Sequence, residues 1–232
     1  IYQKSGSNIA QDFMRYRLGR HINWYKSAQG ETLNKTLVIC FTGMAQRMMI
    51  PLPVFLQHID ASDCDVVMIR YPRGKGYRYG LEGVADGFAA TVAKLGAILP
   101  VQRYERTVTI GVSGGGLPAV MAALRLNFDA ALSFSGGHPE DPRWQEASGH
   151  TAAKLLQDFM QHTKKNVRGI LAYADSKADE QAAKALSQLL PSSLIRIGDP
   201  NAPVGHVSLL PLLISGQLSR FLRETVLAPR LE

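Results

Sequence analysis

The chain has 232 residues, of which 46% are hydrophobic and 19% are charged. Because domains average roughly 150 residues and no stretch resembles a linker, we expect one domain over residues 1–232 with a sizeable core. This composition excludes disordered and coiled-coil proteins. The formal net charge of +7 is spread along the chain without an RNA-binding or zinc-finger motif, so we expect no nucleic-acid partner.

Hydropathy and cysteine content bear on the compartment. No window approaches the roughly 18 uninterrupted apolar residues of a membrane-spanning helix, and the beginning of the chain lacks the apolar core of a signal peptide. The two cysteines, Cys40 and Cys64, are too few for a disulfide framework or a zinc ribbon. We therefore expect a protein of the reducing cytoplasm with no membrane span and no structural metal.

Short β-branched runs alternate along the chain with longer segments at helical spacing. The first segment, 7–27, is predicted to be a helix followed by a strand that contains HINWY (21–25). In chain order, we expect later strands at 36–41, 65–70, 107–112, 130–134, 169–174 and 194–197, and helices at 84–99, 117–126, 151–162, 178–190 and 207–227. Repeated strand and helix pairs predict an α/β fold with a mostly parallel sheet and helices on both faces.

A G-x-S-x-G motif, GVSGG, runs from Gly111 to Gly115. It ends a predicted strand and opens an Ala-rich predicted helix. This is the context of a nucleophile elbow, in which glycines let the chain turn sharply and expose the serine. The alternative is a glycine-rich turn in which Ser113 only caps the helix. The motif alone leaves both interpretations open.

A nucleophilic serine needs a histidine as base and a carboxylate that orients the histidine. His206 follows the last predicted strand and precedes the last predicted helix. Asp175 directly follows the predicted strand 169–174, at the sheet edge where Ser113 also emerges. Asp179 is the alternative acid, and we favour Asp175 because Asp179 is expected to lie within the next helix. The remaining histidines lack such a context and are interpreted as structural or solvated: His21, His58, His138, His150 and His162.

From Thr36 onward, the elbow and the chain order Ser113, Asp175, His206 resemble the α/β-hydrolase superfamily. The resemblance implies two backbone amides that form an oxyanion hole. Gly114 N–H, directly after the nucleophile, is one donor. Met44 N–H, in the turn FTGM after an early strand, is the other, although Thr42 stands where the family usually has a histidine.

The resemblance also implies a lid-like insertion between two strands, which we place at 138–166. Its length of about 30 residues is too short for a large cap domain. We expect Trp144, Phe159 and Met160 within it to line an apolar pocket.

Cations and tyrosines alternate in the segment RYPRGKGYRY, which follows a predicted strand and should lie at the active-site edge of the sheet. Arg73 and Arg78 are the residues that we expect to bind an anionic or sugar group of the substrate. The alternative is an ordinary solvated turn.

Together these patterns predict a serine hydrolase, independent of any cofactor or metal, that cleaves a small-molecule ester or thioester through an acyl-enzyme. Two alternatives remain. An acyltransferase would use the same triad with an acceptor other than water. A non-catalytic binding module would use only the hydrolase scaffold.

Overall fold

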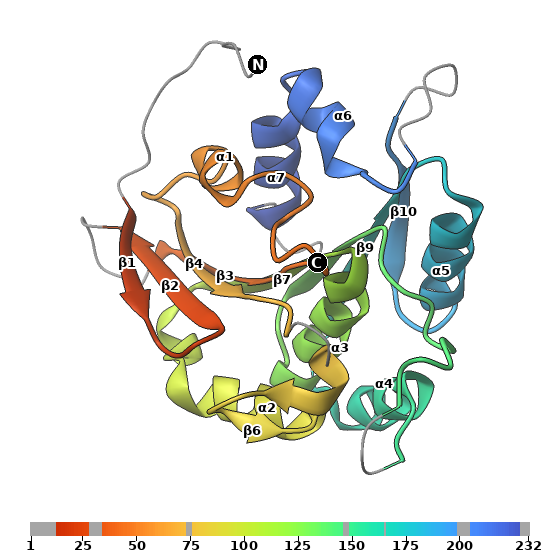
Figure 1. Cartoon of the computed structure of the whole chain (residues 1–232). Helices are drawn as coiled ribbons and strands as arrows, with labels where there is room; N and C mark the ends of the chain where they lie inside the picture. The colour runs from red at the N-terminus through yellow and green to blue at the C-terminus, as the bar shows by residue number, and fades with distance from the viewer. Residues whose placement is uncertain are drawn as a thin grey trace.

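The computed structural model describes residues 13–27, 34–72, 76–145, 149–164, 166–198 and 205–227. These residues form an eight-stranded sheet with the strand order β1-β2-β4-β3-β7-β8-β9-β10 (Figure 1). The strands are β1 (Phe13–Arg17), β2 (Ile22–Ser27), β3 (Thr36–Phe41), β4 (Cys64–Ile69), β7 (Arg106–Val112), β8 (Ala130–Phe134), β9 (Arg168–Tyr173) and β10 (Ser192–Arg196). β1 and β2 are antiparallel to their neighbours, whereas the other six strands are parallel. A separate two-stranded sheet joins β5 (Gly80–Leu81) and β6 (Ala85–Asp86).

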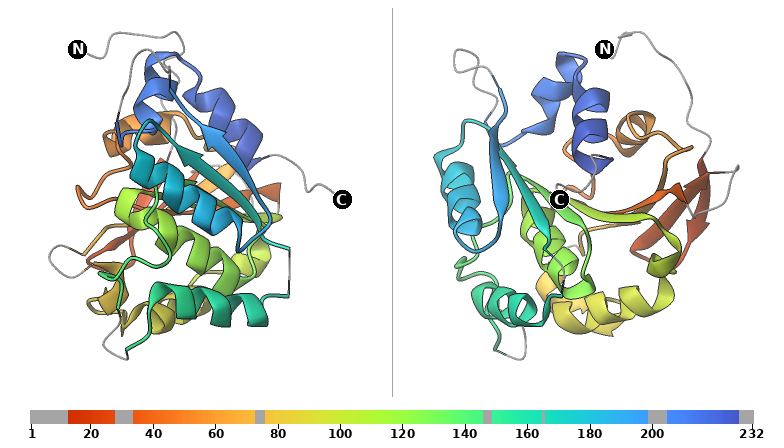
Figure 2. Two further views of the ribbon diagram at one scale, coloured as in Figure 1. Left: turned by 90° about the vertical axis from the view of Figure 1, so that its right-hand side faces the viewer. Right: turned by 180° about the vertical axis from the view of Figure 1, so that it is seen from behind.

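Helices cover both faces of the large sheet (Figures 1 and 2). The α-helices are α1 (Leu52–Gln57), α2 (Phe88–Ile98), α3 (Gly116–Leu126), α4 (Ala152–His162), α5 (Lys177–Ser187), α6 (Leu209–Ile214) and α7 (Leu218–Val226), and the 3₁₀ helices are η2 (Tyr77–Tyr79), η3 (Val101–Arg103) and η4 (Ser113–Gly115). One face packs against α2, α3, α4 and α5, and the other against α1, α6 and α7. No helix in the described ranges is long and apolar enough to cross a membrane.

The alternation of side chains along β3 shows why its sequence is apolar from Leu37 to Phe41. Leu37, Ile39 and Phe41 belong to the core on the α2 and α3 side, whereas Val38 and Cys40 belong to the core on the α1 and α7 side. All five are at most 1% exposed. A central parallel strand has no solvated face, so it has no place for the polar residues of a half-buried strand.

The predicted α/β fold with a mostly parallel sheet is confirmed, with differences at the two ends of the chain. Residues 13–17 form strand β1 and not a helix, because Arg15 pairs with Tyr25 in an antiparallel ladder. The predicted positions 7–12 lie outside the described residues. The predicted helix 207–227 is two helices, because Gly216 adopts a φ of +71° and ends α6.

A buried polar cluster lies where β4 begins, at the opposite end of the strand from Tyr71 and the loop that follows. Asp65 is 1% exposed and accepts a hydrogen bond of 2.6 Å from the Tyr104 hydroxyl. Lys35 Nζ lies 3.7 Å from the other carboxylate oxygen of Asp65. Burial, together with the neighbouring Asp65 carboxylate, raises the pKa of Tyr104 above its ordinary range. The tyrosine therefore remains a neutral hydrogen-bond donor.

Tyr104→Phe should lower the free energy of unfolding by about 1–3 kcal/mol, because it leaves the buried Asp65 carboxylate without one of its donors. Urea denaturation at pH 7 measures the loss. Tyr79→Phe is the matched control, since Tyr79 is 42% exposed, and it should change the free energy of unfolding by less than about 0.5 kcal/mol. Equal stability of the two variants would contradict a stabilising role for the Tyr104 hydroxyl.

Candidate active site

The chain turns sharply between β7 and α3, and Ser113 lies at this turn. Ser113 has a φ of +51°, in the left-handed region that residues other than glycine rarely adopt. Such strain persists only where the surrounding structure holds it, and it is frequent at functional sites. The hydroxyl of Ser113 contacts His206 and makes no helix-capping hydrogen bond, so the capping interpretation of this serine is not supported.

The glycines of the motif are required by close backbone contacts. A Cβ atom at Gly111 would lie 2.1 Å from the carbonyl oxygen of Gly115. A Cβ atom at Gly115 would lie 2.2 Å from the carbonyl oxygen of Phe41, at the end of β3. Since real Cβ atoms do not approach other atoms so closely, only glycine fits at either position. The turn that carries Ser113 is thereby held against the end of the neighbouring strand.

A chain of hydrogen bonds joins a serine, a histidine and a carboxylate. His206 Nε2 lies 2.7 Å from Ser113 Oγ, and His206 Nδ1 lies 2.8 Å from Asp179 Oδ2 and 3.0 Å from Oδ1. The side chain of Asp179 is 8% exposed and that of His206 is 48% exposed. The geometry allows Nδ1–H to donate to the carboxylate while Nε2 accepts the serine proton.

The assignment of Asp175 as the partner of His206 is corrected by this geometry. Asp175 accepts a hydrogen bond of 3.1 Å from Arg196, which lies on the neighbouring strand β10. Asp179 lies in the first turn of α5, where Ser176 Oγ accepts a hydrogen bond from its backbone N–H. Helical side chains tilt toward the helix N-terminus, so Asp179 points back to the sheet edge although it belongs to the helix. The spacing Ser176-x-x-Asp179, typical of a helix start, was the signal that could have identified it.

The charge of Asp179 affects the protonation of His206. Its hydrogen bond raises the pKa of His206 above the ordinary value of 6.5, while partial burial acts in the opposite direction. An imidazolium at this position is therefore stabilised by a carboxylate that is itself largely removed from solvent.

Met44 and Gly114, the predicted oxyanion donors, both line the cavity above Ser113. Gly114 lies in the first turn of η4, where backbone N–H groups have no intrahelical acceptor. Gly43 directly precedes Met44, and it lies so close to the elbow that a Cβ atom on Gly43 would be 3.2 Å from Ser113 Cβ. The turn after β3 and the start of η4 thus meet at Ser113, an arrangement that a pair of oxyanion donors requires.

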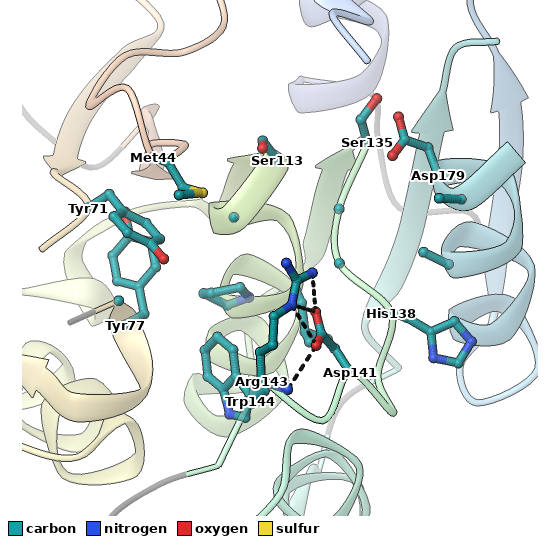
Figure 3. A pocket seen from close by; sticks show the side chains of 18 of the residues that line it. Met44, Tyr71, Tyr77, Ser113, Ser135, His138, Asp141, Arg143, Trp144 and Asp179 are labelled. Carbon is teal, nitrogen blue, oxygen red and sulfur yellow. Dashed lines mark hydrogen bonds and ion pairs between the residues drawn. The ribbon is translucent and has the colours of Figure 1, made fainter. Parts of the chain in front are cut away.

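The cavity has a volume of about 480 Å³ and combines apolar and charged walls (Figure 3). Tyr71 and Trp144 provide aromatic surface. The guanidinium of Arg143 points into the cavity, where Nε and NH2 donate to both oxygens of Asp141 at 2.7–3.1 Å. These hydrogen bonds lower the pKa of the Asp141 carboxyl and keep it ionised. Arg143 was not identified from the sequence.

Arg78 lines the same cavity, but one of its nitrogens donates a hydrogen bond to the backbone carbonyl of Arg143. Its guanidinium also lies 4.6 Å from the ring centroid of Tyr79. Arg78 thus connects two wall segments in addition to supplying a charge. Arg73, the other predicted cation, lies outside the described residues.

The segment 138–166 lines the cavity partly through residues other than those we predicted. Trp144 lines it, but Phe159 and Met160 belong to α4 and pack in the core on that side of the sheet. His138, which we interpreted as structural or solvated, also lines the cavity. Figure 3 shows its ring turned away from Ser113.

Ser135 is a further cavity residue that the sequence did not indicate. It follows β8 directly, is buried, and has a φ of +47°. Its hydroxyl donates a 3.1 Å hydrogen bond to Ser208, two residues beyond His206. This contact ties the segment that carries the histidine to the end of β8.

Within the described ranges, no three His, Cys, Asp or Glu side chains gather in a group that could hold a metal ion.

Comparisons with known proteins agree with this architecture. No family model and no curated protein matches the chain. Among solved structures, it is similar to an S-formylglutathione hydrolase from Agrobacterium tumefaciens, with a TM-score of 0.60 and 14% identity over 96% of this chain and 99% of that one. The esterase Est1E from Butyrivibrio proteoclasticus gives a TM-score of 0.55 and 15% identity over 94% and 100% of the two chains. A dienelactone hydrolase from Anabaena variabilis gives a TM-score of 0.55 and 14% identity over 93% and 100%. From its sheet order, its elbow and these likenesses, we conclude that the chain has the α/β-hydrolase fold.

Proposed function

We propose that the protein is a serine hydrolase that cleaves a small-molecule ester or thioester through an acyl-enzyme. The observation that carries the proposal is the hydrogen-bonded chain from Ser113 through His206 to Asp179, with distances of 2.7 and 2.8 Å. The elbow strain at Ser113 and the esterases among the similar structures support it.

In the acylation step, Ser113 Oγ attacks the carbonyl carbon while His206 Nε2 takes the hydroxyl proton. The Asp179 carboxylate stabilises the imidazolium, and the amides of Met44 and Gly114 donate to the oxyanion. The tetrahedral intermediate collapses as His206 returns the proton to the leaving alcohol or thiol. Water then attacks the acyl-enzyme and loses a proton to the same imidazole. As the bond between the acyl carbon and Ser113 Oγ breaks, His206 returns this proton to Oγ, and the acid leaves.

The experiment that tests the proposal is labelling with a fluorophosphonate, followed by peptide mass spectrometry. Stoichiometric modification of Ser113 is expected, since the reagent reports an activated serine. A folded protein with an unmodified Ser113 would leave the non-catalytic scaffold as the better description. Esters and thioesters of graded acyl length would then define the acyl group.

Ser113→Ala and His206→Ala should each reduce ester turnover by on the order of 10³ or more, and the double variant should be little worse, because the two residues act as a unit. Initial rates with a p-nitrophenyl ester measure the loss. Ser187→Ala and His162→Ala are the matched controls, since Ser187 is half-buried, His162 is exposed, and both lie outside the cavity. Turnover that survives in Ser113→Ala would remove this serine from the mechanism.

Asp179→Asn should lose far more activity than Asp175→Asn and should also lower the pKa of His206. The pKa of His206 should fall because the hydrogen bond to Asp179 raises it in the intact protein. Because only neutral His206 acts as a base, the acidic limb of the kcat/KM profile should lie above pH 6.5 in the unaltered enzyme and move to lower pH in Asp179→Asn. NMR titration of the His206 ring provides a readout independent of activity, and an unchanged pKa in Asp179→Asn would overturn this role.

The arginines in the cavity wall predict a preference for anionic esters. Arg78 and Arg143 line the cavity, and the Arg143 side chain is 86% exposed, so each attraction amounts to roughly 1 kcal/mol or less. For a carboxylate-bearing ester, kcat/KM should fall as salt rises, whereas an isosteric neutral ester should barely respond. Replacing both arginines with Gln should abolish the difference. Equal salt responses for the two esters in the unaltered protein would contradict the preference.

A further inference from the structure

A second cavity lies beside the turn that follows β3 and shares no lining residue with the cavity at Ser113. Its volume is about 250 Å³. Three arginines line it, namely Arg15, Arg47 and Arg70, and no carboxylate does. The other lining residues are Tyr25, Thr42, Gln46, Leu52 and Met68.

The sheet topology explains why arginines from distant parts of the chain converge here. Arg15 lies on β1 opposite Tyr25 of β2, and β2 in turn pairs with β4. Arg70 follows β4 and extends this pairing, because its backbone N–H donates to His21 at 2.8 Å. Arg47 belongs to the turn after β3, the next strand of the sheet. The cavity is thus built on adjacent strands and does not depend on a single loop.

The groups around this cavity have more hydrogen-bond donors than acceptors. Arg15 donates two hydrogen bonds to Asn23 Oδ1, from Nε at 3.1 Å and from NH2 at 3.0 Å. This amide oxygen is a neutral acceptor. Asn23 is 1% exposed, and its Nδ2 has no hydrogen-bond partner among the described residues. Among the described residues, the guanidinium groups of Arg47 and Arg70 make no hydrogen bond and no ion pair.

We propose that Arg15, Arg47 and Arg70 form a binding site for a small multivalent oxyanion, with a phosphate group as the ligand that fits best. Guanidinium groups bind such oxyanions through pairs of parallel N–H donors, and three of them surround a single cavity. An anion there offsets the mutual repulsion of the three cations and supplies the acceptors that the site lacks. Free phosphate and the phosphoryl group of a metabolite share this chemistry.

The test is isothermal titration of the full chain with inorganic phosphate and with pyrophosphate, at an ionic strength held constant with sodium chloride. Saturable binding with one site per chain is expected. The double variant Arg47→Gln, Arg70→Gln should lose at least tenfold in affinity. The control Arg103→Gln, Arg125→Gln removes the same charge from exposed positions elsewhere and should bind as the unaltered protein does.

Three outcomes would overturn the proposal. These are no saturable binding at millimolar phosphate, an equal loss in both double variants, and full competition by chloride at matched ionic strength. Circular dichroism establishes that each variant is folded. If Arg47→Gln, Arg70→Gln does not fold, Arg15→Gln takes its place, because Arg15 is an exposed residue on the edge strand. Binding is read without any substrate, so the result is independent of the proposed hydrolase activity.

Discussion

The contact between the elbow and the end of β3 determines where the candidate site is built. Gly115 lies so close to the carbonyl of Phe41 that no side chain fits between them. This contact holds the turn that carries Ser113 against β3, and the turn after β3 carries Gly43 and Met44. The serine and the proposed oxyanion donors are consequently placed by the backbones of two adjacent parallel strands, both of which are buried almost throughout.

Charge is divided between the two ends of the sheet. Where β4 begins, Asp65, Lys35 and Tyr104 form a closed polar cluster beneath the surface. Where the strands end, charged groups face cavities: Asp179 binds His206, and Asp141 orients Arg143. Paired charges in the first region stabilise the fold, whereas those in the second keep donors and acceptors available for a ligand. This division is usual for parallel sheets, in which ligands bind beyond the carboxyl ends of the strands.

Sequence patterns predicted the six parallel strands, most of the helices and the pair Ser113 and His206, because these depend on local periodicity and on chain order. They did not predict the edge strand β1 or the short helix α1. They failed for the acid, since the choice between Asp175 and Asp179 depends on the direction of a helical side chain and on competition from Arg196. They also missed Arg143, which has no neighbouring motif and acquires its orientation only from Asp141. Ser135 was equally invisible, because its contact with Ser208 joins residues that are 73 positions apart. Such pairings depend on tertiary structure, which one sequence does not reveal.

The hydrogen bond from Arg78 to the Arg143 carbonyl has a consequence for protein engineering. It joins the segment that follows β4 to the one that follows β8, and together these segments form much of the cavity wall. Grafting either loop alone from another protein of this fold would separate two surfaces that support each other. Loop exchange should therefore transfer both segments as a unit and leave the elbow as it is.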